Sequence, residues 1–294
     1  MKFAIYAQTY KAGYKQIVEK LVRSIKDNHG EIVFEKPFYD LLKTNDVLDY
    51  DYNTFEDYND LDESTNFFVS IGGDGTMLRA ANYVKHKNIP LVGVNAGRLG
   101  FLANVQENAI EFLIPLLFSN QYTLSRRTLL KLDKPTKEAT NFKVNFALNE
   151  ITVARKNTTS MITVDTFVDD EFLATYWADG IIISTPTGST GYNLSCGGPI
   201  LTPSSNCLII TPIAPHNLTT RPLIISDRSK IKMKIQSREN EFLLSMDSDS
   251  ATLSTNDEVE ISLANHTVNL VEFPSVTFLK TLRNKLMWGE DKRN

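Results

Sequence analysis

The chain has 294 residues, which suits one large domain or two modest ones. Apolar residues make up 42% and charged residues 22%, as in an ordinary globular protein, so general disorder is excluded. The net charge of −4 argues against a broad basic surface for nucleic acid, and no apolar run has the length of a membrane span or the form of an export signal. Cys196 and Cys207 are too few for a disulfide framework. We therefore expect a cytoplasmic protein with reduced thiols that binds neither nucleic acid nor membranes.

The first hundred residues alternate between strand and helix patterns. Short apolar segments predict strands at residues 3–7, 32–34, 66–71 and 91–94. Apolar residues at helical spacing predict helices at residues 15–26 and from 77 to about 85. Such alternation predicts an α/β domain with a parallel sheet and helices on its faces.

Residues 45–64 contain eight Asp and Glu residues and no Lys or Arg. An acidic metal site is one interpretation of this segment. The acids show no ligand spacing, however, so a solvated loop with helical turns is the simpler hypothesis.

Strand patterns dominate after residue 120, and a helical pattern returns only at the end of the chain. There Phe278, Leu279, Leu282, Leu286 and Met287 form one apolar stripe that must be buried against another element. A sheet with helices on its faces offers such a place, whereas a β domain mostly covers its own inner faces. We therefore expect an α/β domain of residues 1–103 and 275–294, and a mostly β domain of residues 104–274.

The first of two glycine-rich segments is the GGDGT loop, Gly72-Gly73-Asp74-Gly75-Thr76, which follows a buried strand directly. Glycines at such a point let the backbone approach a ligand closely, and the helix start that follows favours anions. A plain strand-to-helix turn would need only one glycine. The loop therefore predicts phosphate binding.

Asp74 is unusual in an anion site, because a negative charge beside phosphate is unfavourable unless the carboxylate has a task. It could hold Mg²⁺, accept a proton from an attacking hydroxyl, or cap the next helix through its side chain. We favour the role of proton acceptor.

The second glycine-rich segment is the STPTGST loop, residues 184–199, which follows Asp179-Gly180 and an apolar strand. It places many hydroxyl groups on glycine turns, so it can offer donors to a phosphate or a sugar. Tyr192 could stack on a base or simply pack as an ordinary aromatic residue. No histidines fall into metal-ligand spacing, and no nucleophile elbow is present.

The motifs of the chain resemble those of the NAD kinase family. The GGDGT loop alone is shared by NAD kinases and diacylglycerol-type lipid kinases. The remaining motifs follow in the order of an NAD kinase along most of the chain: residues 95–102 (NAGRLGFL), Asn149-Glu150, Asp179-Gly180, the STPTGST run, Pro215-His216 and Arg221-Pro222. This resemblance implies transfer of a phosphoryl group from ATP to the adenosine 2′-hydroxyl of NAD, giving NADP. It also implies an α/β domain and a β domain with the active site between them.

The same resemblance implies a set of site residues. Asp74 would be the proton acceptor, and Gly72, Gly73 and Gly75 would approach the phosphates. Arg79, one turn into the helix, would reach a phosphate, and its alternative is a surface salt bridge. Asn149 and Glu150 would bind ribose hydroxyls, and Asp179 would accept a hydrogen bond from the nicotinamide carboxamide. The adenine would lie among residues of the STPTGST loop, with Tyr192 stacked on it and Asn193 and Ser195 bonded to its edge. The other expected lining residues are Phe101, Thr187, Thr190, Gly191 and Leu194.

The sequence also departs from the family pattern. Gly191 replaces a frequent alanine, Trp177 a frequent basic residue, and Asp247-Ser248-Asp249 a frequent Asp-Gly-Gln. No cluster of carboxylates has ligand spacing, so we expect Mg²⁺ to arrive with ATP instead of being held as a resident metal. The resemblance implies a homodimer or homotetramer. The alternatives are a lipid kinase of the same superfamily, which would lack the STPTGST run, and a dinucleotide-binding sensor, which would not need Asp74.

Overall fold

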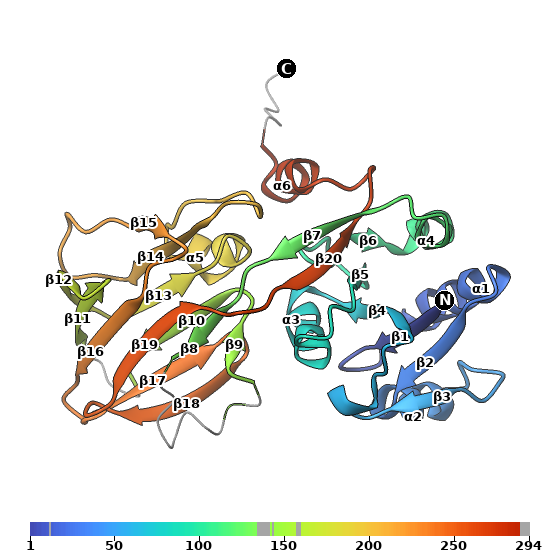
Figure 1. Ribbon diagram of the computed structural model, residues 1–294, viewed down its shortest axis with the longest axis horizontal. Helices are drawn as coiled ribbons and strands as arrows, with labels where there is room; N and C mark the ends of the chain where they lie inside the picture. The colour runs from blue at the N-terminus through green and yellow to red at the C-terminus, as the bar shows by residue number, and fades with distance from the viewer. Residues whose placement is uncertain (12, 134–141, 143, 157–159, 289–294) are drawn as a thin grey trace. The chain divides into compact units, whose positions relative to one another are not determined.

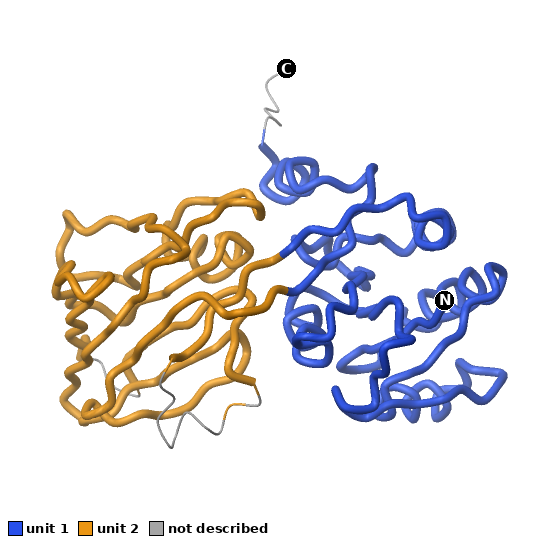
Figure 2. The backbone as a smooth tube through the Cα atoms, in the orientation of Figure 1, with its two compact units in different colours: residues 1–126, 268–294 blue, residues 127–267 orange. Residues whose placement is uncertain are grey.

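The computed structural model describes residues 1–11, 13–133, 142, 144–156 and 160–288, and the chain divides into two compact units (Figure 2). Unit 1 comprises Met1–Arg126 and Val268–Asn294, and unit 2 comprises Arg127–Thr267. The sequence placed the boundaries at 103/104 and 274/275. In the structure the chain therefore stays longer in unit 1 before it enters unit 2, and it returns earlier.

Unit 1 is built on an eight-stranded sheet with the order β3-β2-β1-β4-β5-β20-β7, to which β6 adds beside β5 (Figure 1). The pairs of β1 with β2 and β4, and of β5 with β4, β6 and β20, are all parallel. The strands are β1 Lys2–Tyr6, β2 Glu31–Glu35, β3 Asn53–Phe55, β4 Thr65–Gly72, β5 Leu91–Asn95, β6 Val105–Gln106, β7 Thr123–Arg127 and β20 Val268–Glu272. The parallel sheet expected from the sequence is confirmed.

Helices cover both faces of this sheet, because alternate residues of the buried strands point to opposite sides. Phe67, Val69 and Ile71 of β4 join one core with α1, α2 and α4. Phe68 of β4 faces the other way and stacks on Tyr83 of α3. The helices are α1 Tyr14–Asp27, α2 Lys36–Thr44, α3 Asp74–Val84, α4 Ile110–Phe118 and α6 Phe278–Leu286, with 3₁₀ turns at Tyr58–Asp60 and Glu107–Ala109. The acidic segment contains β3 and the first of these turns.

Unit 2 contains two antiparallel sheets of six strands each, with the orders β15-β14-β13-β10-β17-β18 and β12-β11-β16-β19-β8-β9. Inner-face residues of both, such as Ile151 and Ile181 of the first and Val164 and Met233 of the second, form one core. Asp169 and Asp170 have positive φ angles at the expected hairpin turn. The strands are β8 Leu130–Leu132, β9 Phe146–Ala147, β10 Glu150–Ala154, β11 Ile162–Val168, β12 Glu171–Ala178, β13 Gly180–Ser184, β14 Cys207–Ile213, β15 Leu223–Ser226, β16 Ile231–Gln236, β17 Glu241–Met246, β18 Asp249–Ser254 and β19 Glu258–Leu263. A 3₁₀ turn at Gly188–Thr190 and the short helix α5 Tyr192–Ser195 follow β13.

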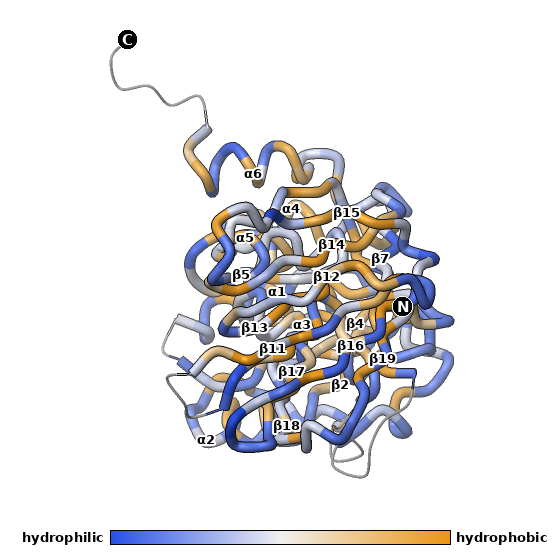
Figure 3. The backbone as a smooth tube through the Cα atoms, turned by 90° about the vertical axis from the view of Figure 1, so that its left-hand side faces the viewer, coloured by the Kyte–Doolittle hydropathy of each residue, from blue (hydrophilic) through white to orange (hydrophobic). Residues whose placement is uncertain are grey.

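The last strand and the last helix both belong to unit 1. The sequence assigned residues 268–271 to the β domain, but β20 pairs with β5 through Leu270 and Leu91. Helix α6 is in unit 1, as expected, and Leu282 is buried there. The expected apolar stripe is wrong in part, because Leu279 and Met287 are 62% and 67% exposed. Polar and apolar segments alternate along α6 (Figure 3).

Candidate active site

The GGDGT loop joins a buried strand to a helix in unit 1. Gly72 ends β4 and Asp74 begins α3, with Gly73 at the N-cap position and no side chain capping the helix. A Cβ atom at Gly72 would lie 2.3 Å from Oγ1 of Thr76, so the turn requires glycine there. A Cβ atom at Gly73 or Gly75 would meet nothing within 4 Å. The loop therefore leaves open space at a helix start whose first N–H groups lack intrahelical partners, as an anion site requires.

The carboxylate of Asp74 is held by a turn that follows β5. Its Oδ2 accepts the backbone N–H of Phe101 at 2.9 Å, and its Oδ1 accepts those of Leu102 and Ala103 at 2.9 and 3.0 Å. A Cβ atom at Gly100 would lie 2.0 Å from Oδ1, so glycine makes room for this contact. Asp74 thus does not cap α3 through its side chain, which was the structural alternative raised by the sequence. Three N–H donors instead fix its carboxylate beside the loop.

Asn95 shapes the turn that holds Asp74. Its Nδ2 donates to the carbonyl of Arg98 at 2.6 Å, and its Oδ1 accepts the N–H of Gly97 at 2.8 Å. The side chain is nearly buried, at 5% exposure. Within the motif of residues 95–102 the sequence assigned a task only to Phe101. The structure shows that the motif builds the turn that holds the Asp74 carboxylate.

Two cations belong to this part of unit 1. Nζ of Lys285 on α6 lies 3.6 Å from Oδ2 of Asp74, a contact that the sequence did not indicate. Arg79 is half-buried on α3, and no carboxylate of the described residues lies within salt-bridge distance of it. The salt-bridge alternative for Arg79 therefore has no partner in the described chain. The charge of Arg79 does act on Tyr6 of β1: burial and the nearby Glu35 carboxylate raise the pKa of Tyr6 to about 12, and the guanidinium of Arg79 partly counteracts this shift.

In unit 2, Asn149 and Glu150 lie on a turn that is held by Asp247. Oδ2 of Asp247 accepts the N–H of Leu148 at 2.7 Å, and Oδ1 accepts those of Asn149 and Glu150 at 2.8 and 3.1 Å. The N–H of Asp247 donates in return to the carbonyl of Glu150 at 3.0 Å. Burial raises the pKa of Asp247 to about 6 despite these donors. The sequence noted Asp247 only as part of a departure from the family pattern.

Several polar atoms around this turn are buried without a partner. Oδ1 of Asn149, Oε2 of Glu150 and Oγ1 of Thr187 have no hydrogen bond to any described residue. Burial raises the pKa of Glu150 to about 8, and the charge of Asp247 makes a smaller contribution in the same direction. The backbone N–H of Tyr192 donates to this carboxylate and lowers the pKa only in part. Buried polar atoms without partners are unfavourable in a finished fold. Hydroxyl groups of a ligand would satisfy them.

The STPTGST loop is bonded directly to this turn. The N–H of Thr185 donates to the carbonyl of Asn149 at 2.9 Å, and its Oγ1 donates to the carbonyl of Leu148 at 2.7 Å. The same Oγ1 accepts the N–H of Gly188 at 3.1 Å. A Cβ atom at Gly191 would lie 3.1 Å from Oε2 of Glu150, which places the loop against that carboxylate. The structure thus brings together Asn149, Glu150 and the loop, as the resemblance implied.

The side chain of Asn193 holds the STPTGST loop together. Its side chain is fully buried. Its Nδ2 donates to the carbonyls of Ser189 and Pro199, each at 3.0 Å, and its Oδ1 accepts the hydroxyl of Thr211 at 2.6 Å. The amide is thus engaged in holding the loop, and the expected contact between Asn193 and an adenine edge stays a prediction.

The other residues of the loop differ in how accessible they are. Tyr192 is 45% exposed, and Ser195 is exposed as well. Thr190 and Leu194 are half-buried, and the hydroxyl of Thr190 donates to the carbonyl of Thr187. These four residues can still contact a ligand.

Asp179 and Trp177 lie at the end of β12. Oδ1 of Asp179 forms an ion pair with Nε of Arg155 at 3.1 Å. Trp177 is 57% exposed, and its ring meets that of His216 edge-on at 6.1 Å. The sequence predicted neither partner.

No group of three or more His, Cys, Asp or Glu side chains in the described chain is placed to hold a metal ion. The carboxylate of Asp74 already accepts three N–H groups and faces Lys285, so it does not fit a resident Mg²⁺ site. No described helix is long and apolar enough to cross a membrane.

Family models match both parts of the chain. Residues 3–122 match the ATP-NAD kinase N-terminal domain, and residues 148–273 match the ATP-NAD kinase C-terminal domain. The NAD kinases of Flavobacterium psychrophilum and Flavobacterium johnsoniae are 50% and 51% identical to this chain, and each match covers the full length of this chain and of the relative. The chain belongs to the NAD kinase family. It is accordingly a phosphotransferase that acts on NAD, and the lipid-kinase and sensor alternatives are set aside.

Solved structures of NAD kinases share the fold. Yeast NADH kinase in complex with NADH has a TM-score of 0.87 and 22% identity, and the match covers all of this chain and 89% of the yeast chain. An NAD kinase of Archaeoglobus fulgidus in complex with ATP has a TM-score of 0.74 and 24% identity, with 98% of each chain covered. The α/β unit followed by a β unit is therefore the architecture of this family.

Proposed function

We propose that Asp74 is the general base of the NAD kinase reaction, in which the γ-phosphoryl group of ATP passes to the adenosine 2′-hydroxyl of NAD. The observation that carries this proposal is a carboxylate fixed by three backbone N–H donors beside an open, glycine-lined helix start. Oδ2 accepts only one of those N–H groups, so it retains a lone pair that can take the hydroxyl proton. The α3 start and Arg79 would bind the donor phosphates.

Unit 2 would bind NAD. Oδ1 of Asn149 and Oε2 of Glu150, which lack partners in the described structure, would accept the hydroxyl groups of a ribose. Tyr192 would stack on the adenine, and Asp179 would accept the carboxamide N–H of nicotinamide. With these contacts the ribose hydroxyl is oriented by the protein, so phosphoryl transfer gains mainly from positioning.

Mg²⁺ would arrive with ATP, because no described cluster of side chains is arranged as a metal site. When bound, the ion would neutralise charge on the phosphate oxygens, which are its usual ligands. The chain's own residues would hold the phosphates through N–H groups and cations.

The test is NADP formation from NAD with ATP, other nucleoside triphosphates or polyphosphate as donor, each with and without Mg²⁺. The proposal expects turnover with ATP and Mg²⁺, and none with diacylglycerol as acceptor. Turnover with polyphosphate alone would contradict the assignment of ATP as the donor.

We also propose a cytoplasmic homodimer or homotetramer. Both cysteines are free thiols, which supports a reducing compartment. Leu279, Met287 and Trp288 are exposed on or beside α6, and assembly would cover such apolar side chains. Analytical ultracentrifugation of the purified chain would measure its oligomeric state, and a monomer would contradict the proposal.

A further inference from the structure

Helix α6 brings a positive charge to the carboxylate of Asp74. Nζ of Lys285 lies 3.6 Å from Oδ2 of Asp74 and 4.8 Å from the centre of the Phe101 ring. The backbone N–H of Phe101 donates to the same Oδ2. Two segments that are far apart in the sequence therefore meet at the oxygen that we assign to proton transfer.

The position of Lys285 is fixed by the way α6 is attached to unit 1. Oγ1 of Thr277 caps the helix by accepting the N–H of Lys280 at 3.3 Å. The ring of Phe278 lies 6.2 Å from that of Phe101, and Leu282 is buried. Residues 278, 282 and 285 follow the spacing of one helix face, so the packing that anchors α6 also directs Lys285 toward the GGDGT loop.

Lys285 contributes a positive charge beside Asp74 and is not needed to orient the Asp74 carboxylate. The three backbone N–H groups already fix the Asp74 carboxylate. The side chains of Lys285 and Asp74 are 33% and 30% exposed, and ion pairs with such exposure are weak and easily exchanged. The loop beside them has open space at Gly73 and Gly75. A flexible ammonium group with three donors is well suited to bind a phosphate that enters there.

We propose that Lys285 is a phosphate-binding residue of the donor site. It offsets the negative charge of Asp74 in the free enzyme, and it binds the phosphate chain when ATP arrives. This inference rests on the proposed function, which places the phosphates of ATP at the GGDGT loop. It explains how a carboxylate can stand beside a polyanion, because the cation of α6 is already there.

The test compares three single variants of the full chain. Lys285→Met removes the charge but keeps an unbranched apolar side chain over the Phe101 ring. Lys285→Arg keeps the charge. Arg283→Met removes one charge from the same helix at an exposed position that lies about 200° around the helix from residue 285.

We expect Lys285→Met to raise the KM for ATP by about tenfold or more while the KM for NAD stays within about twofold. Lys285→Arg should restore most of the affinity for ATP, and Arg283→Met should behave as the unchanged chain. The melting temperatures of all variants should agree. Equal KM values for ATP in Lys285→Met and Arg283→Met would overturn the inference. So would a parallel rise of the KM for ATP and the KM for NAD in Lys285→Met, or a lowered melting temperature of that variant.

Asp74→Asn, measured in parallel, separates this inference from the proposed function. If Asp74→Asn loses turnover while Lys285→Met keeps its KM for ATP, only the role of Lys285 is wrong. If Asp74→Asn keeps full turnover while Lys285→Met raises the KM for ATP, only the base assignment is wrong, because the inference needs the phosphates of ATP at the GGDGT loop and not a base there.

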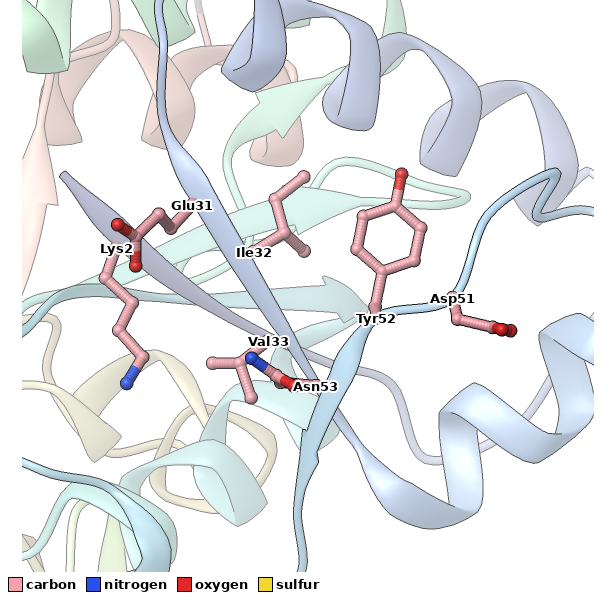
Figure 4. A pocket seen from close by; sticks show the side chains of 7 residues that line it. All are labelled: Lys2, Glu31, Ile32, Val33, Asp51, Tyr52 and Asn53. Carbon is pink, nitrogen blue, oxygen red and sulfur yellow. The ribbon is translucent and has the colours of Figure 1, made fainter.

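A cavity elsewhere in unit 1 supports no proposal of a binding site. It has a volume of about 420 Å³ and lies at the β3 edge of the sheet, between Lys2 and Glu31 at one end and Asp51 and Tyr52 at the other (Figure 4). Lys2 pairs with Asp62, and Asp51 pairs with Lys43, so these charges are already satisfied.

Discussion

Glu150 and Asp247 are joined by a reciprocal pair of hydrogen bonds. The N–H of Glu150 donates to Oδ1 of Asp247, and the N–H of Asp247 donates to the carbonyl of Glu150. The two carboxyl groups are thereby held in a buried setting, where the charge of Asp247 adds to the desolvation of Glu150. The cost of ionising Glu150 should therefore be visible in the stability of the protein.

Stability should fall as the pH rises through the range in which Glu150 ionises. Its pKa is about 8 in the folded chain against an ordinary value of 4.5, so the folded state binds more protons between these limits. Stability from this group is fully present below about pH 4.5 and is lost as the pH rises to about 8. Glu150→Gln should reduce the loss of unfolding free energy between pH 5 and pH 8.5 by about 4 kcal/mol, because about three pH units separate pH 5 from the folded pKa and each unit corresponds to about 1.4 kcal/mol.

Urea unfolding of both chains at the two pH values measures this difference. Glu239→Gln is the matched control, since Glu239 is an exposed carboxylate of the same unit. The assignment fails if Glu150→Gln and Glu239→Gln show the same pH dependence as the unchanged chain.

Asp74→Asn should abolish most of the activity while NAD still binds. We expect kcat to fall by at least about 10²-fold, which is the usual scale for loss of a general base. The asparagine oxygen can still accept the N–H groups of Leu102 and Ala103, but its amide would face the N–H of Phe101, so a modest fall in melting temperature should accompany the change. Steady-state kinetics and NAD titration check both points, and a kcat within a few-fold of the unchanged chain would exclude the base role.

Gly100→Ala tests whether the turn after β5 supports catalysis. The new methyl group would lie 2.0 Å from Oδ1 of Asp74, so the carboxylate or the turn must shift. Gly97 lies in the same turn, and a Cβ atom there would meet nothing within 4 Å. We expect Gly100→Ala to lower kcat by about tenfold or more, because small misplacements of a reacting group are costly, and Gly97→Ala to remain close to the unchanged chain. Equal kcat values for the two variants would show that this turn does not position Asp74.

The sequence predicted the parallel sheet of unit 1 well but missed two of its helices. The helix α4 has the sequence IEFLIPLLF, which is apolar almost throughout and contains Pro115, so its pattern has no helical period. The helix α2 is short and has Pro37 in its first turn, and its cap is the side chain of Glu35, which accepts the N–H of Phe38. In β20 the local pattern predicts a strand, but it cannot tell which sheet the strand joins.

The site residues that the sequence missed are those that act from a distance along the chain. Asn149 and Glu150 belong to a recognisable motif, whereas the Asp247 carboxylate that holds them comes from the turn between β17 and β18. Lys285 reaches Asp74 from α6. No local spacing encodes either contact, because both depend on how distant elements pack. The contacts of Asn193 were not predicted for the same reason, since its partner Thr211 lies on β14.

The attachment of α6 to unit 1 gives the last prediction. Leu282 is buried at 5% exposure, whereas Leu279 on the same helix is 62% exposed. Truncation of a buried leucine removes its apolar surface from the core and leaves a cavity, so Leu282→Ala should lower the unfolding free energy by about 2–4 kcal/mol. Leu279→Ala changes helix propensity and side-chain volume by the same amount, but at an exposed position. It should therefore change the unfolding free energy by less than about 0.5 kcal/mol. Because Lys285 follows Leu282 by one turn, Leu282→Ala should also raise the KM for ATP, and Leu279→Ala should not. Denaturant unfolding and kinetics of the two variants measure both effects, and equal stabilities would show that α6 is not packed on unit 1 as described.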